Sequence, residues 1–278
     1  FAEMKKRKML YSLILVIVVV GVLGSMTQLK RFSQPVSKPI EDNLEKKIPV
    51  LLYHHILKDD ENIKHKENSA VVSYEQFYEQ MKYLSDNNIK TIDTQELYQY
   101  LVNGIELQER CVVITFDDGY LSNDLYAYNI MKEFNQKGDI FLITNTIYVE
   151  PEFFNPDKIQ KLDWNRILEM QDIFTFYSHT DIKSLHIVKP TALTVKSKDI
   201  IEMDLIKSFG YEPIKTLAFA YPYGAYDDNV ISILRKNNVK LAYTVEPGYV
   251  TLISDLYKLN RFIIGPETTM EEFKNILN

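Results

Sequence analysis

Polar residues that could move a proton or bind a metal ion directly follow several apolar stretches of this sequence. VVITF is followed by Asp117 and Asp118, and IFTFYS is followed by His179, with His186 seven residues later. One carboxylate and two imidazoles are a ligand set suited to zinc or a similar divalent ion with an open position for water. The second carboxylate could then act as general base on that water.

Each of these signals also has an ordinary structural interpretation. Asp and Gly are common turn residues, and a His at a strand end often only packs and donates to a backbone carbonyl. The same holds for His54 and His55 after PVLLY, and for the YPYG turn after LAFA. The combination favours a catalytic site, because four of the five histidines fall at or near the ends of apolar stretches.

The elements that must position these residues alternate along the chain from residue 48 onward. Strands are predicted at 49–54, 89–92, 111–116, 139–144, 173–178, 217–221, 239–245 and 257–264. Helices are predicted at 73–86, 94–103, 121–134, 164–170, 198–209, 227–237 and from 269. Capping boxes are predicted at the first and last of these, from Ser73 with Gln76 and from Thr269 with Glu272. Continuously apolar strands are typical of a parallel sheet covered by helices. We therefore expect an α/β fold, a (β/α) barrel that is seven-stranded or otherwise distorted, with a doubly wound open sheet as the alternative.

The amino-terminal region predicts attachment to a membrane. Four basic residues at 5–8 precede an uncharged apolar run at 10–26, which is just long enough to span a bilayer core. Positive residues before this run set residues 1–9 in the cytoplasm. We expect a signal anchor at 10–26, a polar linker at 27–47 and an extracellular domain at 48–278. A cleaved signal peptide, which would release a secreted domain, is the alternative.

Composition excludes some classes of function. The 278 residues carry a net charge of −6, so there is no global basic field to hold nucleic acid. The single cysteine, Cys111, cannot form an intrachain disulfide, and a domain of this size can be stable on its core alone. The sequence does not indicate the oligomeric state.

Three motifs together resemble those of the polysaccharide deacetylases, the NodB-homology enzymes of carbohydrate esterase family four. They are TFDDG at 115–119, SHT…LH at 178–186 and YPYG at 221–224. The resemblance covers nearly all of residues 48–278. Its layout, including the late segments EPGY and LNRF, is similar to that of the exported deacetylases of poly-β-1,6-N-acetylglucosamine.

The resemblance implies a role for each motif residue. Asp117 would be the general base, and a divalent metal would be held by Asp118, His179 and His186. Zinc is the expected metal, with cobalt, nickel or iron(II) as alternatives. The residues implied to line the substrate groove are Tyr221, Pro222, Tyr223 and Gly224, with a backbone N–H near Tyr223 helping to hold the oxyanion. The implied reaction is de-N-acetylation of an extracellular amino-sugar polymer.

The spacing of the two histidines departs from the family pattern, in which four or five residues usually separate them. Seven residues of regular helix would rise about 10.5 Å, too far for two imidazoles to share one ion. The segment must therefore bulge for His186 to reach the metal. Otherwise Asp181 replaces His186, or the site is weakened.

Two further departures concern proton transfer and the base. No His follows residue 186, so the late histidine that serves many relatives as general acid is missing, and protonated Asp117 could return the proton instead. The arginine of the third motif is replaced by Phe219 or Ala220. Arg261 could orient Asp117 in its place, and His54 is a further supporting candidate.

Two other functions stay open at this point. The substrate could be N-acetylglucosamine or N-acetylmuramic acid of peptidoglycan, or an O-acetyl ester. The chain could also be a non-catalytic sugar-binding relative, in which the wide histidine spacing has cost a working metal site.

Overall fold

A parallel sheet carries the fold of the computed structural model, which describes residues 46–278 except 109, 183–184 and 187–191. Within these residues the sheet has eight strands in the order β10-β1-β5-β6-β7-β8-β9, with β4 paired to β5. Their bounds are β1 Val50–Tyr53, β4 Lys90–Ile92, β5 Cys111–Asp118, β6 Gly138–Leu142, β7 Phe174–Ser178, β8 Lys215–Ala220, β9 Leu241–Tyr243 and β10 Phe262–Ile263. The carboxyl ends of all these strands therefore lie at one end of the sheet.

The sheet curves into a distorted half-barrel of the (β/α) class, as predicted. Val113 of β5 pairs with Val50 of β1 on one side and with Ile92 of β4 on the other. β4 therefore pairs with the amino-terminal part of β5, and β6 pairs with the carboxyl-terminal part on the same side. On the far side, a parallel bridge between Tyr243 and Leu259 links β9 to the segment that continues into β10. A doubly wound open sheet, the alternative expectation, would instead have two unpaired edge strands.

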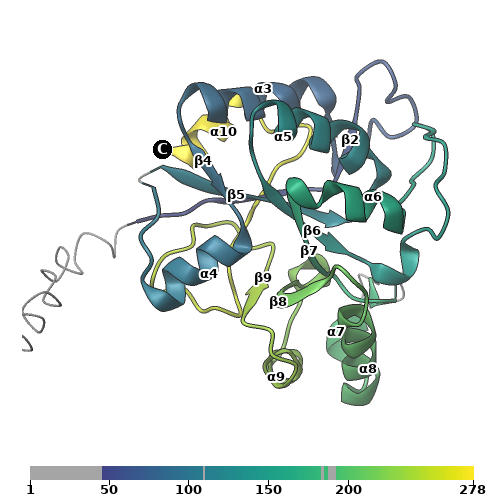
Figure 1. Ribbon diagram of the computed structural model, residues 1–278, viewed down its shortest axis with the longest axis vertical. Helices are drawn as coiled ribbons and strands as arrows, with labels where there is room; N and C mark the ends of the chain where they lie inside the picture. Colours follow the sequence, from purple (N-terminus) through teal and green to yellow (C-terminus); the bar gives the residue numbers. More distant parts are fainter. Residues whose placement is uncertain (1–45, 109, 183–184, 187–191) are drawn as a thin grey trace, which may run out of the picture. The chain divides into compact units, whose positions relative to one another are not determined.

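Helices lie around the outside of the strands, with α3, α5 and α10 on one side and α4, α8 and α9 toward the other (Figure 1). The α-helices are α3 Tyr74–Asp86, α4 Thr94–Asn103, α5 Asn129–Glu133, α6 Trp164–Glu169, α7 Ala192–Val195, α8 Lys198–Phe209, α9 Asp228–Lys236 and α10 Met270–Leu277. Short 3₁₀ turns are η2 Thr144–Thr146, η3 Met170–Asp172 and η5 Pro222–Gly224, and a π-helical turn, η1 Asn123–Tyr128, precedes α5. A small parallel sheet pairs β2 His55–Leu57 with β3 Val71–Ser73.

Side chains of β5 alternate between two apolar layers. Val112, Ile114 and Phe116 pack with the helices outside the sheet, in one cluster with residues of α3 and α5. Val113 belongs to the inner cluster, which includes Phe141, Tyr177 and Tyr243. Because strand side chains alternate with a period of two, Asp117 falls on the inner face at the carboxyl end of β5.

The side-chain caps predicted at the starts of α3 and α10 are present, in full at α10 and in part at α3. Thr269 and Glu272 form the complete capping box expected at α10. At α3, Ser73 accepts from the Gln76 backbone as predicted, but the Gln76 side chain does not complete the box. It donates instead to the carbonyls of Gly265 and Thr268, because that distant segment lies beside α3 in the fold.

The predicted membrane anchor at 10–26 lies outside the described residues, as does all but the end of the linker. Among the residues that the structure describes, no helix has the length and apolar character to cross a bilayer. Residues Leu44–Asn278 form one compact unit.

Candidate active site

Asp117 lies at the carboxyl end of β5 in a buried ion pair with Arg261. The Asp117 side chain is 3% exposed and that of Arg261 is 0% exposed. The two guanidinium nitrogens Nη1 and Nη2 donate to Oδ1 and Oδ2 of Asp117, each at 2.8 Å, and Nε of Arg261 donates to the Thr244 carbonyl. This bidentate geometry fixes the carboxylate plane.

Electrostatics keep Asp117 ionised in spite of its burial. Burial by itself would raise the pKa of Asp117, but the charge of Arg261, then that of His179, and the Arg261 hydrogen bonds lower the pKa overall. A carboxylate that stays charged and still has free lone pairs can accept a proton.

Asp118 turns away from the strand and is held by two neighbours. Its φ is +73°, a left-handed conformation that ends β5. The Tyr120 hydroxyl donates to Asp118 Oδ2 at 2.9 Å, and Lys161 Nζ donates to the Asp118 carbonyl at 3.0 Å. Burial would raise the pKa of Asp118, but Lys161 and His179 lead the charges that lower it far below its usual range.

His179 follows β7 directly and faces both carboxylates. Its Nδ1 lies 2.7 Å from the Ala220 carbonyl. Because a carbonyl only accepts, Nδ1 carries the proton, which leaves Nε2 as the nitrogen that faces the two carboxylates. Nε2 lies 3.8 Å from Oδ2 of Asp117 and 3.7 Å from Oδ1 of Asp118.

His186 reaches this site because the intervening chain is not a regular helix. Thr180 has a φ of +97°, and the Asp204 carboxylate accepts from the backbone N–H groups of Asp181 and Ile182. These contacts fold the segment back, so that the rings of His179 and His186 have centroids only 4.7 Å apart. The chain between the two histidines therefore departs from a helix, as the seven-residue spacing requires if His186 is to lie beside His179.

Hydrogen bonding fixes which His186 nitrogen is available. Nε2 lies 3.0 Å from the His179 carbonyl and 2.9 Å from the Thr180 hydroxyl. Since the carbonyl needs a donor, Nε2 carries the proton and Nδ1 keeps its lone pair. Burial, more than the nearby His179, lowers the pKa of His186 to about 3, so the ring is neutral at pH 7.

Asp118, His179 and His186 together fit a metal ion. One ligand atom from each can be chosen so that all lie within 4.8 Å of one another. Each ring offers one nitrogen to the group, and Asp118 supplies an ionised oxygen. Two imidazoles and one carboxylate match the donor set of catalytic zinc sites.

Asp181, the possible substitute for His186, has a different position. It is fully buried, and its two carboxylate oxygens accept from Thr144 Oγ1 at 2.8 Å and Lys207 Nζ at 2.7 Å. Asp181 is not among the three grouped ligands. Its carboxylate is therefore engaged by Thr144 and Lys207, whereas His186 lies with the grouped ligands.

Of the two histidines after β1, His54 fits the interpretation as a site residue, and His55 fits the structural one. Burial lowers the pKa of His54, while Asp117 and Asp118 raise it, so the His54 ring is within electrostatic range of the site. His55 points elsewhere: its Nδ1 lies 2.7 Å from Ser122 Oγ and its ring stacks on Tyr120 at 4.9 Å.

The YPYG turn contributes less side chain than predicted. Tyr221 and Pro222 are buried, and the Tyr221 hydroxyl donates to the Tyr257 carbonyl. Their side chains pack in the interior. Tyr223 is 50% exposed, and Gly224 has a φ of +70° with Val245 so close that a Cβ would clash. Only the Tyr223 side chain of this turn is well exposed.

Sequence reasoning missed two residues that hold Asp118. Tyr120 directly follows the TFDDG motif, and its position two residues after Asp118 was a usable signal. Lys161 lies 3.8 Å above the Tyr120 ring and is 8% exposed, but it comes from a loop with no pattern that points to the site.

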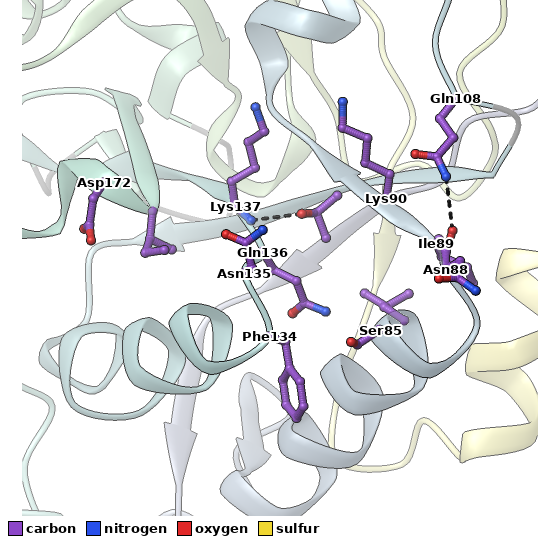
Figure 2. Close-up of a pocket in the computed structure, with 13 residues that line it drawn as sticks. Ser85, Asn88, Ile89, Lys90, Gln108, Phe134, Asn135, Gln136, Lys137 and Asp172 are labelled. Atoms are coloured by element: carbon purple, nitrogen blue, oxygen red, sulfur yellow. Dashed lines mark hydrogen bonds between the residues drawn. The ribbon is translucent and has the colours of Figure 1, made fainter.

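A separate hollow has a volume of about 500 Å³, and Figure 2 shows the residues that line it. Its lining includes Asn88 and Lys90 at the start of β4, and Gln136 and Lys137 just before β6. These residues lie at the amino ends of the strands, whereas Asp117 and Asp118 lie at a carboxyl end. None of the predicted site residues lines it.

Fold and site together define a hydrolase-type centre on a (β/α) half-barrel, and comparison with known proteins gives the family. The family model described as polysaccharide deacetylase matches residues 104–242. The chain is 30% identical over 205 residues to the poly-beta-1,6-N-acetyl-D-glucosamine N-deacetylase of Staphylococcus aureus, covering 70% of this chain and 68% of that protein. The chain belongs to the polysaccharide deacetylase family, and it is a carbohydrate N-deacetylase.

Other relatives agree with this assignment. The poly-beta-1,6-N-acetyl-D-glucosamine N-deacetylase of Staphylococcus epidermidis is 28% identical over 240 residues, covering 83% of this chain and 80% of that protein. The Streptococcus pyogenes deacetylase PplD, solved with acetate, matches with a TM-score of 0.73 at 26% identity, covering 84% of this chain and 99% of that one. IcaB from Ammonifex degensii matches with a TM-score of 0.69 at 23% identity, covering 84% and 97%, which supports the fold.

Proposed function

We propose that this protein removes the N-acetyl groups of poly-β-1,6-N-acetylglucosamine in a reaction that depends on a divalent metal, preferably zinc. The observation that carries the proposal is the grouping of Asp118, His179 and His186 beside the ion-paired Asp117. The choice of polymer rests on the named activity of the staphylococcal relatives.

Asp118, His179 and His186 would hold the ion. When bound, a divalent cation supplies Lewis-acid polarisation of the acetamide carbonyl and lowers the pKa of water. The chain's own contribution to this site is ligand orientation. Ala220 fixes the His179 ring, the His179 carbonyl fixes the His186 ring, and Tyr120 fixes the Asp118 carboxylate.

Asp117 is the general base in this proposal. It takes a proton from the water that attacks the acetamide carbon, while Arg261 keeps its carboxylate oriented. The oxyanion lies near the backbone N–H of Tyr223, which comes at the start of the η5 turn, where helical N–H groups lack an internal partner. Cleavage of the C–N bond gives acetate and a sugar amine.

The proton must return to the leaving nitrogen. Because no His follows residue 186, protonated Asp117 is the first candidate donor, and the proton that it took from water then balances the reaction. His54 is a second donor within electrostatic range of the site.

The test is acetate release from β-1,6-linked N-acetylglucosamine oligomers, with β-1,4-linked oligomers and wall-derived glycans as parallel substrates. We expect release that stops with a chelator, returns with zinc and is absent from Asp117→Asn. Release from wall glycans alone would replace the proposed polymer with peptidoglycan. No release from any substrate by a zinc-loaded protein would overturn the enzymatic proposal in favour of a sugar-binding function.

The expected location is the outer face of a membrane, through an anchor at 10–26. The support is the sequence pattern of that segment, and an extracellular polymer as substrate is consistent with it.

A further inference from the structure

Tyr223 is the residue of the YPYG turn whose side chain has no assigned task in the chemistry. Its backbone is left-handed, with a φ of 56° and a ψ of 18°, and its ring is 50% exposed. Its hydroxyl lies 2.9 Å from the backbone carbonyl of His186. Because the carbonyl can only accept, the Tyr223 hydroxyl donates this hydrogen bond.

This carbonyl belongs to His186, a predicted metal ligand whose spacing in the sequence from the other histidine ligand, His179, is unusual. His186 follows His179 by seven residues, so its place beside the His179 ring depends on contacts that hold a folded-back chain. The His186 ring is held by the His179 carbonyl, and Leu185, which precedes it, is 2% exposed in a cluster with Phe219. The Tyr223 hydroxyl adds a contact to the main chain of His186 from a different loop.

Strain at Thr180 makes such a contact useful. A β-branched residue with a φ of +97° lies in a sparsely populated region and persists only where neighbouring contacts hold it. Asp204 holds Asp181 and Ile182 at the beginning of the segment. Tyr223 holds its end at His186.

We propose that Tyr223 is a positioning residue for the metal site, and that its hydroxyl fixes His186 across the seven-residue spacing. This rests on the proposed function, since it assumes that His186 binds the metal. The two parts of the side chain are then separable. The hydroxyl orders the metal ligand, and the exposed ring face remains available to the polymer.

The test is Tyr223→Phe in the full chain, which removes the hydroxyl and keeps the ring. Loss of a contact that orients a metal ligand typically weakens metal binding about 10- to 100-fold. We expect a zinc Kd raised by about tenfold, measured by competition with a chromophoric chelator. We also expect a kcat that recovers at saturating zinc and a KM for the oligomer that does not change.

Tyr226→Phe is the matched control. Tyr226 is partly buried and lies three residues after Tyr223, with its ring tilted against that of Tyr221 at a centroid distance of 5.1 Å. Its hydroxyl has no hydrogen bond to the described residues. Its zinc Kd should equal that of the unmodified protein. Tyr223→Ala, which removes the ring as well, should raise KM in addition to the zinc Kd.

The outcomes separate the inference from the function beneath it. Unchanged zinc affinity in Tyr223→Phe, with or without a raised KM, overturns the positioning role. An unmodified protein that binds no stoichiometric zinc overturns the metal-dependent function itself, and the inference with it. Equal thermal unfolding of the metal-free proteins excludes a general loss of fold as the cause of a weaker Kd.

Discussion

Among single residues, Arg261 determines the orientation of the Asp117 carboxylate and lowers its pKa. A carboxylate 3% exposed would be costly without a partner, and the bidentate guanidinium provides one. The same contact takes the place of the arginine missing from the third motif, where Phe219 and Ala220 stand. An arginine that is distant in sequence therefore contacts Asp117, the proposed base, in space.

Replacing Arg261 by alanine should damage both stability and proton transfer. An uncompensated buried charge costs about 3–5 kcal/mol, which should appear as a lower free energy of unfolding in denaturant. Because Arg261 lowers the pKa of Asp117, its removal should also move the acid limb of the pH–kcat profile to higher pH. A profile with an unmoved acid limb would mean that Asp117 is not the titrating base.

A double variant and a surface variant make this test specific. Arg261→Met combined with Asp117→Asn removes both charges and should recover part of the stability without recovering activity. Arg110→Ala, at an exposed arginine, should change the free energy of unfolding by less than about 0.5 kcal/mol.

Among the secondary-structure elements, strand β6 carries another buried carboxyl, that of Asp139. Asp139 is 0% exposed, and its Oδ2 accepts from the backbone and the hydroxyl of Thr94 at 2.9 and 2.7 Å. Its other oxygen, Oδ1, has no hydrogen-bond partner among the residues that the structure describes. Burial, against the opposing effect of the Thr94 hydrogen bonds, raises the pKa of Asp139 to about 8.

This carboxyl should make stability fall as the pH rises. An unfolded Asp loses its proton near pH 4, whereas the folded protein keeps it until about pH 8. Between these values the unfolded chain binds fewer protons, so the free energy of unfolding decreases with pH. Asp139→Asn should therefore be more stable, by roughly 1–4 kcal/mol at pH 7 and by little at pH 4.

Chemical denaturation at several pH values between 4 and 8 measures this difference. Asp199→Asn, at an exposed position in the first turn of α8, is the control and should not show the same widening gap. A constant difference between Asp139→Asn and the unmodified protein would contradict a carboxyl that is neutral in the fold.

The sequence predicted most elements of the domain because their signals are local. Apolar runs gave the major strands, and Thr269 with Glu272 gave the start of α10. The residues Asp117, Asp118 and His179 were found because each directly follows such a run. Local pattern and final position agree at these points.

The remaining features depend on contacts between distant segments. Gln76 reaches residues near 265 rather than its own helix start, and Lys161 reaches Asp118 from a loop without a recognisable pattern. The position of His186 depends on Asp204 and Tyr223. Neither the period of a helix nor the spacing in the sequence contains that information.

The whole molecule combines a compact catalytic unit with a predicted anchor. Residues Leu44–Asn278 form the unit, and the apolar segment 10–26 precedes it. We expect the full chain to sediment with membranes. A chain of residues 44–278 should stay in the supernatant and retain acetate release from short oligomers.

Cell fractionation followed by the acetate assay checks this expectation. A full chain that partitions like the 44–278 chain and keeps its amino-terminal segment would overturn the anchor. A released, shortened protein found by mass spectrometry would instead indicate a cleaved signal peptide.

The bond between Asp117 and Arg261 also relates the site to the order in which the chain is made. Asp117 is synthesised first, and its guanidinium partner follows 144 residues later. A nascent or broken chain that ends before residue 261 contains the TFDDG motif and both histidines of the SHT…LH motif, yet it leaves Asp117 without its counter-charge. The site can therefore be complete only after residue 261 has been translated. Unfinished chains should be inactive rather than partly active.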